Sequence, residues 1–497
     1  MTKTAYSELA QPTRWKSLSD LTRTKTIATL GPACADRETI VELILQGVDI
    51  FRLNMAHGNR EQHQQALQDI RWAGSEANVP VAILVDLAGP KIRLGKLFED
   101  PFNCDVGSHL TFVRGENPGA ANELVCTYEN LVDEVSVGDE IMLRDGLVKL
   151  QVLEKNSDSA KCVVLDGGEI RSRQGVNLPG VRLTVSALGK VDCDNAIWAC
   201  QNQVDFVSLS FVRTAEEICQ LKKVLRSNNS NAVAIAKIEK REALDNLESI
   251  VEAADGIMVA RGDLGVEIAI EKTPIVQKQI IRMCQDHGKP VIVATQMLES
   301  MHDSRQPTRA EVSDVANAIL DGADACMLSG ETAIGQFPRQ SVAMMRKIML
   351  ETETILEGRK SRESRDRDMP MSVVSQAVVY GAAVIARRLK ARMVVIATVT
   401  GESALVKSKQ RDFVPTIAVT DSPETLRRMC LYWGITPVLT ERLSHQENLF
   451  ELVNSWSLED YSILEGDRII CVVDSEMMPG IHDTVVVTEI GLNHKAT

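Results

Sequence analysis

A lysine and a glutamate two residues apart, Lys237 and Glu239, end a run of apolar and β-branched residues. In a β-strand, residues at this spacing point to the same face. The ammonium and the carboxylate would therefore enter one site from the end of one strand. Such a pair suits a reaction on a phosphorylated acid, because the cation neutralises developing negative charge and the carboxylate holds a divalent metal ion. The alternative is a solvated ion pair at a strand end.

A second acidic group follows in the segment Asp255–Gly265, which reads Asp-Gly-Ile-Met-Val-Ala-Arg-Gly-Asp-Leu-Gly. Its apolar part indicates another strand, and Asp263 lies just beyond the end of that strand. Carboxylates from neighbouring strands of a parallel sheet meet at the same edge, so Glu239 and Asp263 would share one hard cation. This agreement favours a metal site over a solvated ion pair.

The composition is that of a soluble multidomain protein. The chain has 497 residues, 44% hydrophobic and 25% charged, which predicts two to four globular domains. Its net charge of −13 argues against a general nucleic-acid surface, although anionic substrates need only a local cluster of Lys and Arg. The first twenty residues lack the apolar core of a signal peptide, and no apolar run approaches the roughly 18 residues of a membrane span.

The 11 cysteines are scattered and form no Cys-x-x-Cys pair. Most lie in apolar stretches, as Cys326 and Cys471 do. Buried free thiols in a reducing cytoplasm explain them better than disulfides or a metal site. The expected location is therefore the cytoplasm.

Short apolar runs alternate with helix-like segments through much of the chain. Continuous apolar strands of this kind predict a parallel sheet covered on both faces. Eight such units indicate an α/β fold built on a closed (β/α)8 TIM barrel, with an active site at the carboxyl ends of the strands. An open, doubly wound sheet is the alternative. The predicted strands are Lys25–Leu30, Asp49–Met55, Val81–Leu87, Asp205–Phe211, Ala232–Ile238, Gly256–Ala260, Pro290–Gln296 and Ala325–Ser329.

Interruptions of this alternation predict the domain boundaries. Residues 91–187 contain short strands and turn signals, which indicate a small all-β lid domain inserted into a barrel loop. The charged stretch 358–371 indicates a linker. Residues 372–497 alternate again and predict a C-terminal α/β domain with strands at Met393–Val399, Thr416–Thr420, Arg468–Val473 and Asp483–Ile490. The barrel would then comprise residues 21–90 and 188–357, preceded by an N-terminal extension, 1–20.

Taken together, the motifs of the chain resemble those of the pyruvate kinases over almost its whole length. The resemblance implies a barrel with a lid and a regulatory-type domain, and transfer of a phosphoryl group from phosphoenolpyruvate to ADP, giving pyruvate and ATP in glycolysis. It also implies Mg²⁺ or Mn²⁺ as cofactor and a homotetramer. The motifs are Arg23–Ala33, Phe51–Gly58, Gly175–Gly180, Ile235–Glu239, Asp255–Gly265, Ala294–Met301 and Pro307–Ala333.

The resemblance assigns roles at the carboxyl ends of the strands. Arg52 would grip a phosphoryl group through two donors, with Asn54 on the same strand face; a strand-end salt bridge is the alternative for Arg52. Lys237 would stabilise the enolate oxygen while Glu239 and Asp263 ligate Mg²⁺. Substrate binding would also involve the backbone of Ala260, Arg261 and Gly262, which would precede a short helix, and the Thr295 hydroxyl beside the carbon that is protonated.

The nucleotide would lie near Pro32, Asn54, His57 and Arg93, with Arg93 reaching its phosphates as the lid closes. A structural role is the alternative for His57, as it is for most single histidines. Arg173 and Gln174 stand before Gly175–Gly180 where lysines are common in the family, so the lid residue that contacts the nucleotide stays open.

Three positions depart from the family pattern in a coordinated way. Ala56 and Leu87 replace a serine and a threonine, and Lys91 replaces a glutamate; with Asp86, these positions form the monovalent cation site of potassium-requiring members. The Lys91 ammonium would supply the positive charge of the missing ion, so we expect activity without K⁺. The alternative is that Lys91 points to solvent and the ion site is simply altered.

A possible effector loop follows the first strand of the last domain. Thr398, Thr400, Gly401 and Ser403 would form a phosphate loop at the start of a helix. Val399 and Glu402 stand where basic residues occur in relatives activated by sugar bisphosphates, so a monophosphate is the expected ligand. A plain helix cap is the alternative.

Two other functions remain open from the sequence. One is another Mg²⁺-dependent barrel enzyme acting on phosphoenolpyruvate or pyruvate, such as a carbon–carbon lyase, but such enzymes lack the inserted lid. The other is a non-catalytic binding relative, which would be expected to lose Lys237, Glu239, Asp263 or Thr295; all four are present.

Overall fold

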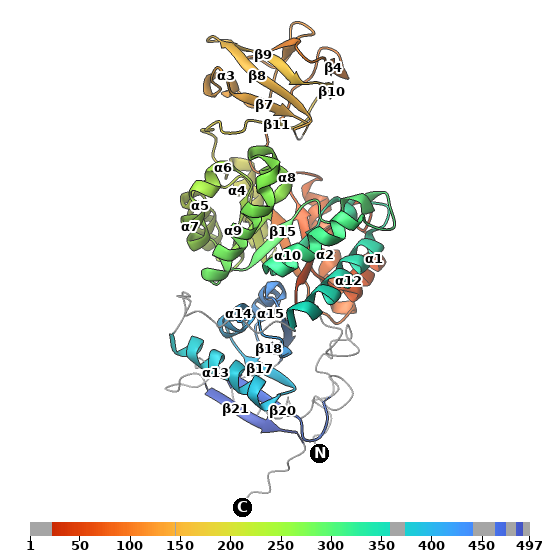
Figure 1. Ribbon diagram of the computed structural model, residues 1–497, viewed down its shortest axis with the longest axis vertical. Helices are drawn as coiled ribbons and strands as arrows, with labels where there is room; N and C mark the ends of the chain where they lie inside the picture. The colour runs from red at the N-terminus through yellow and green to blue at the C-terminus, as the bar shows by residue number, and fades with distance from the viewer. Residues whose placement is uncertain (1–21, 145, 358–372, 441–462, 474–483, 491–497) are drawn as a thin grey trace, which may run out of the picture.

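The computed structural model describes residues 22–144, 146–357, 373–440, 463–473 and 484–490. In Figure 1 a small β domain, a barrel and an α/β domain follow one another along the long axis. The predicted N-terminal extension (1–20) and linker (358–371) lie outside the described residues. Among the described helices, none is long and apolar enough to cross a membrane.

The central domain is a closed barrel of eight parallel strands. Their order is β1-β16-β15-β14-β13-β12-β3-β2, and β1 pairs with β16 to close the ring. The predicted barrel is therefore confirmed, and the doubly wound alternative is wrong. The strands are β1 (Lys25–Thr29), β2 (Val48–Asn54), β3 (Ala82–Asp86), β12 (Phe206–Leu209), β13 (Val233–Ile238), β14 (Gly256–Ala260), β15 (Val291–Ala294) and β16 (Ala325–Leu328).

Helices cover the outside of the barrel and begin at clear sequence signals. Helix α10 starts after Thr308, whose side chain and that of Glu311 form a reciprocal capping box, and it ends at Gly322 in the left-handed region. The helices are α1 (Arg37–Gln46), α2 (Arg60–Glu76), α4 (Lys190–Gln201), α5 (Ala215–Ser227), α6 (Arg241–Asp245), α7 (Leu247–Ala253), α8 (Arg261–Glu267), α9 (Thr273–Asp286), α10 (Arg309–Asp321), α11 (Gly330–Ala333) and α12 (Pro338–Glu357), with 3₁₀ turns η2 (Ile270–Lys272) and η3 (Glu299–His302).

The lid domain is inserted between β3 and α4. It consists of a six-stranded sheet, a two-stranded sheet and one short helix, so the prediction of a small, essentially all-β insertion is confirmed. The two connections to the barrel run side by side, because Arg93 and Gly175 pair in an antiparallel bridge. The elements are β4 (Phe102–Cys104), β5 (His109–Val113), β6 (Glu123–Leu124), α3 (Leu131–Glu134), β7 (Glu140–Leu143), β8 (Val148–Lys155), β9 (Ser159–Asp166), β10 (Gly168–Ile170) and β11 (Val176–Asn177).

The described part of the C-terminal domain forms a five-stranded sheet of order β19-β18-β17-β20-β21, in which β21 is antiparallel, with helices of an α/β domain. The sequence prediction missed β19. That strand contains Pro437, and proline weakens a strand pattern but is tolerated at a sheet edge. The elements are α13 (Val373–Leu389), β17 (Met393–Ala397), α14 (Glu402–Lys409), β18 (Thr416–Thr420), α15 (Pro423–Arg428), η4 (Met429–Leu431), β19 (Ile435–Leu439), β20 (Arg468–Val473) and β21 (Thr484–Glu489).

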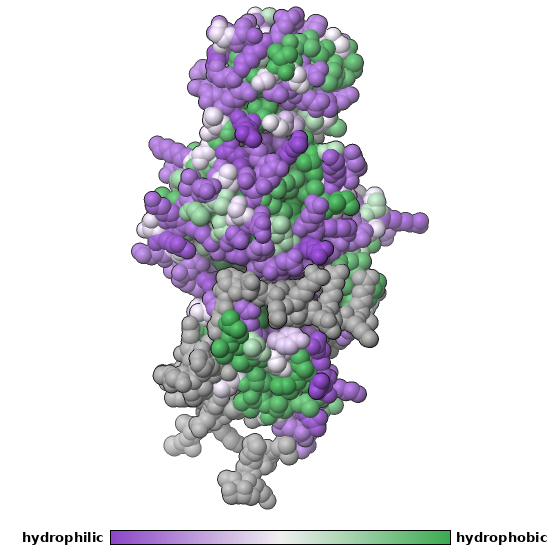
Figure 2. All heavy atoms as spheres, turned by 60° about the vertical axis from the view of Figure 1, so that its left-hand side comes forward, coloured by the Kyte–Doolittle hydropathy of each residue, from purple (hydrophilic) through white to green (hydrophobic). Residues whose placement is uncertain are grey.

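Surface polarity differs between the parts of the molecule. In Figure 2, hydrophilic residues cover most of the visible face of the lid and barrel, while apolar residues gather on the described part of the C-terminal domain. Helix α13 leaves Val373 and Tyr380 exposed, and β21 leaves Val487 exposed. The cysteines of the described residues are free thiols and are mostly buried; Cys219 is exposed.

Candidate active site

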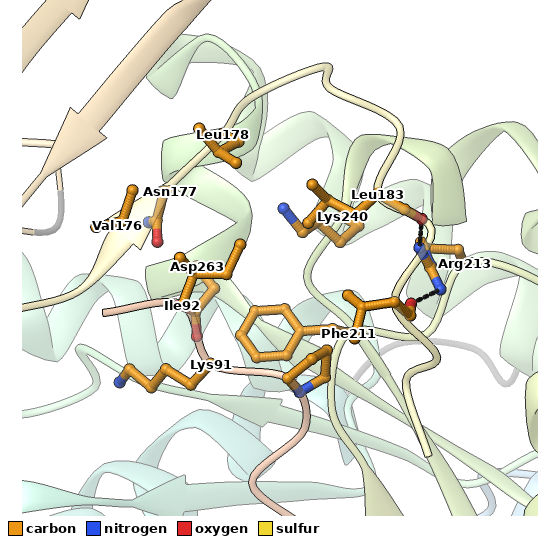
Figure 3. A pocket seen from close by; sticks show the side chains of 12 residues that line it. Lys91, Ile92, Val176, Asn177, Leu178, Leu183, Phe211, Arg213, Lys240 and Asp263 are labelled. Atoms are coloured by element: carbon orange, nitrogen blue, oxygen red, sulfur yellow. Dashed lines mark hydrogen bonds between the residues drawn. The ribbon is translucent and has the colours of Figure 1, made fainter. Parts of the chain in front are cut away.

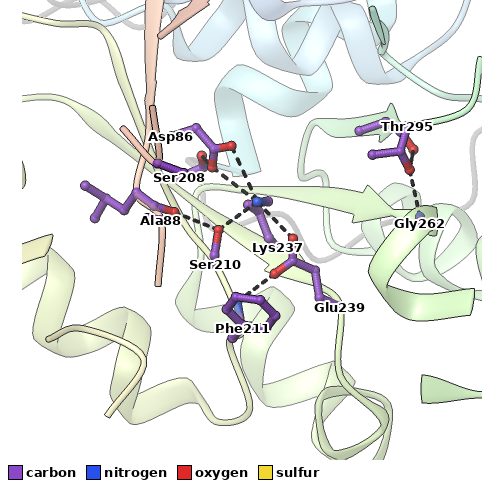
Figure 4. Close-up of polar contacts among 12 residues, drawn as sticks. Asp86, Ala88, Ser208, Ser210, Phe211, Lys237, Glu239, Gly262 and Thr295 are labelled. Carbon is purple, nitrogen blue, oxygen red and sulfur yellow. Dashed lines mark hydrogen bonds and ion pairs between the residues drawn. The ribbon is translucent and has the colours of Figure 1, made fainter. Parts of the chain in front are cut away.

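The carboxyl end of β13 brings Lys237 and Glu239 into contact. The Lys237 Nζ lies 2.8 Å from Glu239 Oε1, 3.3 Å from Asp86 Oδ1 and 2.7 Å from the Ser210 hydroxyl (Figure 4). Only 8% of Lys237 and 1% of Glu239 is exposed, so this is not a solvated ion pair. Burial works against the ammonium, but the Asp86 and Glu239 carboxylates outweigh it and raise the pKa of Lys237. Lys237 is therefore a fixed positive charge inside the mouth of the barrel.

Asp86, at the end of β3, holds a second cation beside Lys237. Arg52 on β2 donates from Nε and Nη2 to Asp86 Oδ2, at 2.8 and 2.5 Å, and from Nη1 to the Thr29 hydroxyl. Burial alone would raise the pKa of Asp86, but Lys237 and Arg52 lower it to about 2. The strand-end salt bridge considered for Arg52 thus exists, and it aligns the guanidinium next to Lys237. Asp86 therefore holds two cations side by side at the mouth of the barrel, where both can contact an anionic substrate.

Three residues at the end of β12 belong to this cluster and were not predicted. Ser208 donates to Asp86 Oδ1 at 2.6 Å, and Ser210 donates to the Leu87 carbonyl at 2.7 Å. The Phe211 N–H donates to Glu239 Oε2 at 2.8 Å. Ser208 and Ser210 have the same spacing as Lys237 and Glu239. The rule that residues i and i+2 of a strand point to the same face would therefore have identified this pair as well.

Two carboxylates face the site where a metal ion is expected. Burial, aided by the nearby Asp263, raises the pKa of Glu239 although Lys237 opposes the shift. Asp263 lies in the first turn of α8 and lines a pocket with Lys91, Phe211 and Lys240. Two carboxylates this close repel each other, and a divalent cation removes that repulsion. The donor set, carboxylate oxygens only, fits Mg²⁺ or Mn²⁺.

The loop after β15 holds Thr295 in a strained conformation. Thr295 and Gln296 have φ values of +68° and +55°, which residues other than glycine rarely adopt. The buried guanidinium of Arg261 stabilises this turn by donating to the Thr295 and Gln296 carbonyls, and it is anchored by Asp314 at 2.6 Å. The Arg261 side chain therefore positions the turn that contains Thr295 and Gln296.

One expectation for this loop needs correction. Helix α8 begins at Arg261, so of the three residues predicted to precede it only Ala260 does. The Gly262 N–H is also not directed to open space, since it donates to the Thr295 hydroxyl at 2.8 Å (Figure 4). Gly262 itself has an ordinary φ, and a Cβ there would meet Thr295 only at van der Waals distance. No neighbour within the described ranges explains this glycine, which is consistent with close approach of a ligand.

The residues expected around the nucleotide lie on the barrel rim and in the lid connection. Pro32 follows β1, Asn54 ends β2, and His57 is exposed in the turn before α2. Burial, followed by the positive charges of Lys91, Arg93 and Arg52, lowers the pKa of His57. Arg93 donates to the Arg173 carbonyl at 3.1 Å within the lid connection. Their nucleotide contacts remain predictions.

The residues of the expected potassium site lie at the same end of the barrel. Leu87 is fully buried among the apolar residues of the barrel, and the Ala56 N–H donates to the Asn54 side chain at 3.1 Å. Neither side chain offers an oxygen. Lys91 is exposed, as the alternative required, yet it is near enough to lower the pKa of His57.

The possible effector loop is a tight turn that leads into α14. The Gly401 N–H donates to the Thr398 hydroxyl at 3.0 Å, and Gly401 has φ +85°. Thr398 and Ser403 are buried, and Thr400 is half-buried. The Thr398 hydroxyl thus stabilises the turn itself, much as the alternative of a plain helix cap would have it. Anion binding by this loop remains a prediction.

Comparison with known proteins shows to which family the chain is similar. The family model "Pyruvate kinase, barrel domain" matches residues 21–342, and "Pyruvate kinase, alpha/beta domain" matches residues 376–488. Pyruvate kinases of Staphylococcus aureus and Staphylococcus epidermidis are each 39% identical over 450 residues, which is 90% of this chain and 77% of theirs.

A solved structure extends this similarity to three dimensions. A pyruvate kinase from Cryptosporidium parvum superposes with a TM-score of 0.86 at 33% identity, covering 98% of this chain and 99% of that one. The matches include both the barrel with its lid and the C-terminal domain. The chain therefore belongs to the pyruvate kinase family and is a phosphotransferase of glycolysis.

Proposed function

We propose that the chain transfers the phosphoryl group of phosphoenolpyruvate to ADP with Mg²⁺ or Mn²⁺ and without a requirement for K⁺. The observation that carries the proposal is the buried cluster in which Lys237 and Arg52 share Asp86, next to the carboxylates of Glu239 and Asp263. It supplies fixed positive charge for a departing phosphoryl group and an oxygen-lined place for a divalent cation.

Each residue has a separate role in the proposed reaction, which follows from its position. Lys237 stabilises the enolate oxygen, whose negative charge grows as the phosphoryl group leaves. Arg52, aligned by Asp86, binds the phosphoryl oxygens. Glu239 and Asp263 would hold the metal ion, which would neutralise charge that two cationic side chains leave uncompensated. Thr295 lies one residue beyond β15, where its hydroxyl can take part in protonating the enolate.

Independence of K⁺ is supported by the lack of oxygen donors and by existing charge. Leu87 and Ala56 contribute no side-chain oxygen, Asp86 already pairs with two cations, and Lys91 adds a third positive charge at the rim. A monovalent ion held there would meet repulsion of about 4 kcal/mol from an ammonium at ~4 Å and an effective dielectric near 20.

The decisive experiment measures ADP-dependent formation of pyruvate from phosphoenolpyruvate. We expect activity with Mg²⁺ or Mn²⁺ and none after chelation. Glu239→Gln and Asp263→Asn should lower kcat by roughly 10²-fold or more and raise the metal concentration needed for half-maximal rate. The matched control is Glu252→Gln, an exposed glutamate on α7. Near-normal rates of both site variants at limiting metal would refute the ligand assignment.

Association into a homotetramer is also proposed. The exposed apolar residues of α13 and β21 suit a subunit interface. Light scattering on the purified chain gives the mass directly, and a monomeric mass at micromolar concentration would contradict this proposal.

A further inference from the structure

The residue after Glu239, Lys240, makes a buried ion pair that reaches the lid connection. Its ammonium lies 2.5 Å from Glu267 Oε1, with side-chain exposures of 11% and 5%. Glu267 is the last residue of α8, the helix that begins with Arg261 and carries Asp263. The pair therefore ties the end of β13 to the end of the helix that bears the second expected metal ligand.

The ion pair also lies against the chain that returns from the lid. Lys240 lines one pocket with Leu178, Leu183 and Val185, and the Gly180 backbone is close enough to Glu267 to oppose the rise in its pKa that burial causes. Gly180 has φ +74° with open space where a Cβ would lie. The glycine is thus explained by its backbone conformation. The ion pair consequently lies where three segments meet: the end of β13, the end of α8 and the return connection, residues 178–185.

Both lid connections meet at Phe211 beside this ion pair. The Lys240 Nζ lies 5.9 Å from the centre of the Phe211 ring. A Cβ on Gly89, before the outgoing connection, would lie 2.7 Å from the same ring. Figure 3 shows Lys240 between the return connection and Phe211, and Phe211 in turn donates its N–H to Glu239. Phe211 therefore links both connections to Glu239, one of the two expected metal ligands.

A second ion pair fixes the far end of the return connection. Arg213 donates to the Val185 carbonyl at 2.6 Å and also to the Leu183 carbonyl, and Glu217 holds the guanidinium at 2.6 Å. Residues 178–185 thus meet the barrel near Gly180 at Lys240 and Glu267, and are attached to it at Leu183 and Val185 through Arg213.

We propose that Lys240 is a positioning residue, which through Glu267 holds the return connection on the barrel and so sets the lid over the active site. A buried ion pair gives little net stability, since desolvation offsets its attraction, whereas its directional contacts fix geometry. The proposal rests on the proposed phosphotransfer, because that reaction requires the lid to close over the second substrate.

The test compares Lys240→Met, Lys240→Arg and Glu267→Gln, with Lys222→Met as matched control. Lys222 pairs with Asp255 at 2.6 Å, at the opposite, amino end of the strands. Steady-state kinetics give kcat and both KM values, and hydrogen exchange followed by mass spectrometry reports on residues 176–185. The exchange readout does not depend on activity, so failure of this proposal and of the proposed function can be distinguished.

For Lys240→Met we expect at least fivefold faster exchange in residues 178–185 and a roughly tenfold higher KM for ADP, with a smaller change in kcat. Lys240→Arg should keep the exchange rate and the KM for ADP close to those of the unmodified enzyme. Lys222→Met should change neither the exchange rate nor the KM for ADP. The double variant Lys240→Met/Glu267→Gln should be no worse than the worse single variant. Unchanged exchange in folded Lys240→Met, or equal effects of Lys222→Met, would overturn the proposal.

Discussion

At the scale of single residues, the site depends on how charges share partners. Asp86 neutralises part of the charge of both Arg52 and Lys237, and it does so from a buried position with a pKa lowered to about 2. Lys237 also contacts Glu239 at 2.8 Å, so the charges of the two cations are balanced by two carboxylates. A divalent cation bound by Glu239 would shift this balance in favour of an anionic substrate.

Replacement of Lys237 should affect the reaction much more than substrate binding. In Lys237→Met, the growing charge on the enolate oxygen loses its partner, so kcat should fall by roughly 10²–10³-fold. The KM for phosphoenolpyruvate should change far less, because Arg52 and the proposed metal ion would still bind the substrate. Steady-state kinetics separate the two effects. A raised KM with unchanged kcat would make Lys237 a ground-state binding residue instead.

Asp86 should also leave a signature in the pH dependence of stability. Its folded pKa of about 2 lies below the ordinary value of about 3.9, so its ionised form stabilises the fold by about 2–3 kcal/mol. That contribution is complete above pH ~4 and is lost as the pH falls towards 2. The difference in unfolding free energy between the unmodified enzyme and Asp86→Asn should therefore shrink from pH 7 to pH 3. A constant difference would contradict this.

At the scale of elements, the strands were predictable and several of their contacts were not. Continuous apolar runs locate the barrel strands because both faces of a parallel sheet are buried. The contact between Asp86 and Ser208 depends on β3 lying beside β12, across the whole inserted lid. The side-chain contact follows from the register of these two strands, which the sequence does not specify. The pair Lys240–Glu267 escapes prediction for a similar reason, since it joins the loop after β13 to the last residue of α8, 27 residues farther along the chain.

Backbone strain was the other feature that the sequence did not reveal. Thr295 is β-branched, and nothing in its type predicts a positive φ. The conformation is imposed by Arg261 and Gly262, which bind the two sides of the turn. The residue types near the active site were thus predictable, whereas the orientation of Thr295 required the structure.

The ends of β2 and β3 and the lid connection together should make the enzyme independent of K⁺. Leu87 and Ala56 offer no oxygen to the ion, and Lys91 brings a tethered positive charge. Rates in K⁺-free tetramethylammonium buffer should be within about twofold of those with K⁺, because an ion excluded by about 4 kcal/mol does not bind at millimolar concentration.

The matched variants test the cause of this independence. Lys91→Glu should create a K⁺ requirement, most clearly in combination with Leu87→Thr and Ala56→Ser. Lys96→Glu, a change of the same charge farther along the lid connection, serves as control. Strong stimulation of the unmodified enzyme by K⁺ would refute the charge-replacement argument.

At the scale of the whole molecule, acidic residues at the amino ends of the strands organise the barrel and its neighbour. Every second barrel strand has an aspartate at its amino end. Each aspartate carboxylate accepts a hydrogen bond from a backbone N–H of the preceding strand. Two of them also bind the C-terminal domain: Asp205 pairs with Arg427 at 2.6 Å, and Asp324 with Lys409 at 2.7 Å. The four residues are Asp49, Asp205, Asp255 and Asp324.

The pair between Asp324 and Lys409 should therefore hold the two domains together. Both side chains are at most 1% exposed, and burial lowers the pKa of Lys409 to about 8 although Asp324 opposes the shift. Lys409→Met leaves the carboxylate buried with only Arg411, at 3.0 Å, to compensate it. We expect a loss of about 3–5 kcal/mol in unfolding free energy, measured by urea denaturation.

Two further variants decide whether the buried carboxylate causes that loss. In Lys409→Met/Asp324→Asn no buried carboxylate remains at this position, although Arg411 also loses its ion pair with residue 324. The asparagine oxygen can still accept the N–H of Val291, so part of the stability should return. Lys278→Met breaks a pair in which the lysine side chain is 49% exposed, and it should cost less than about 1 kcal/mol. If Lys409→Met is no more destabilising than Lys278→Met, the domains are held by their apolar contacts, and the buried pair serves only to fix their orientation.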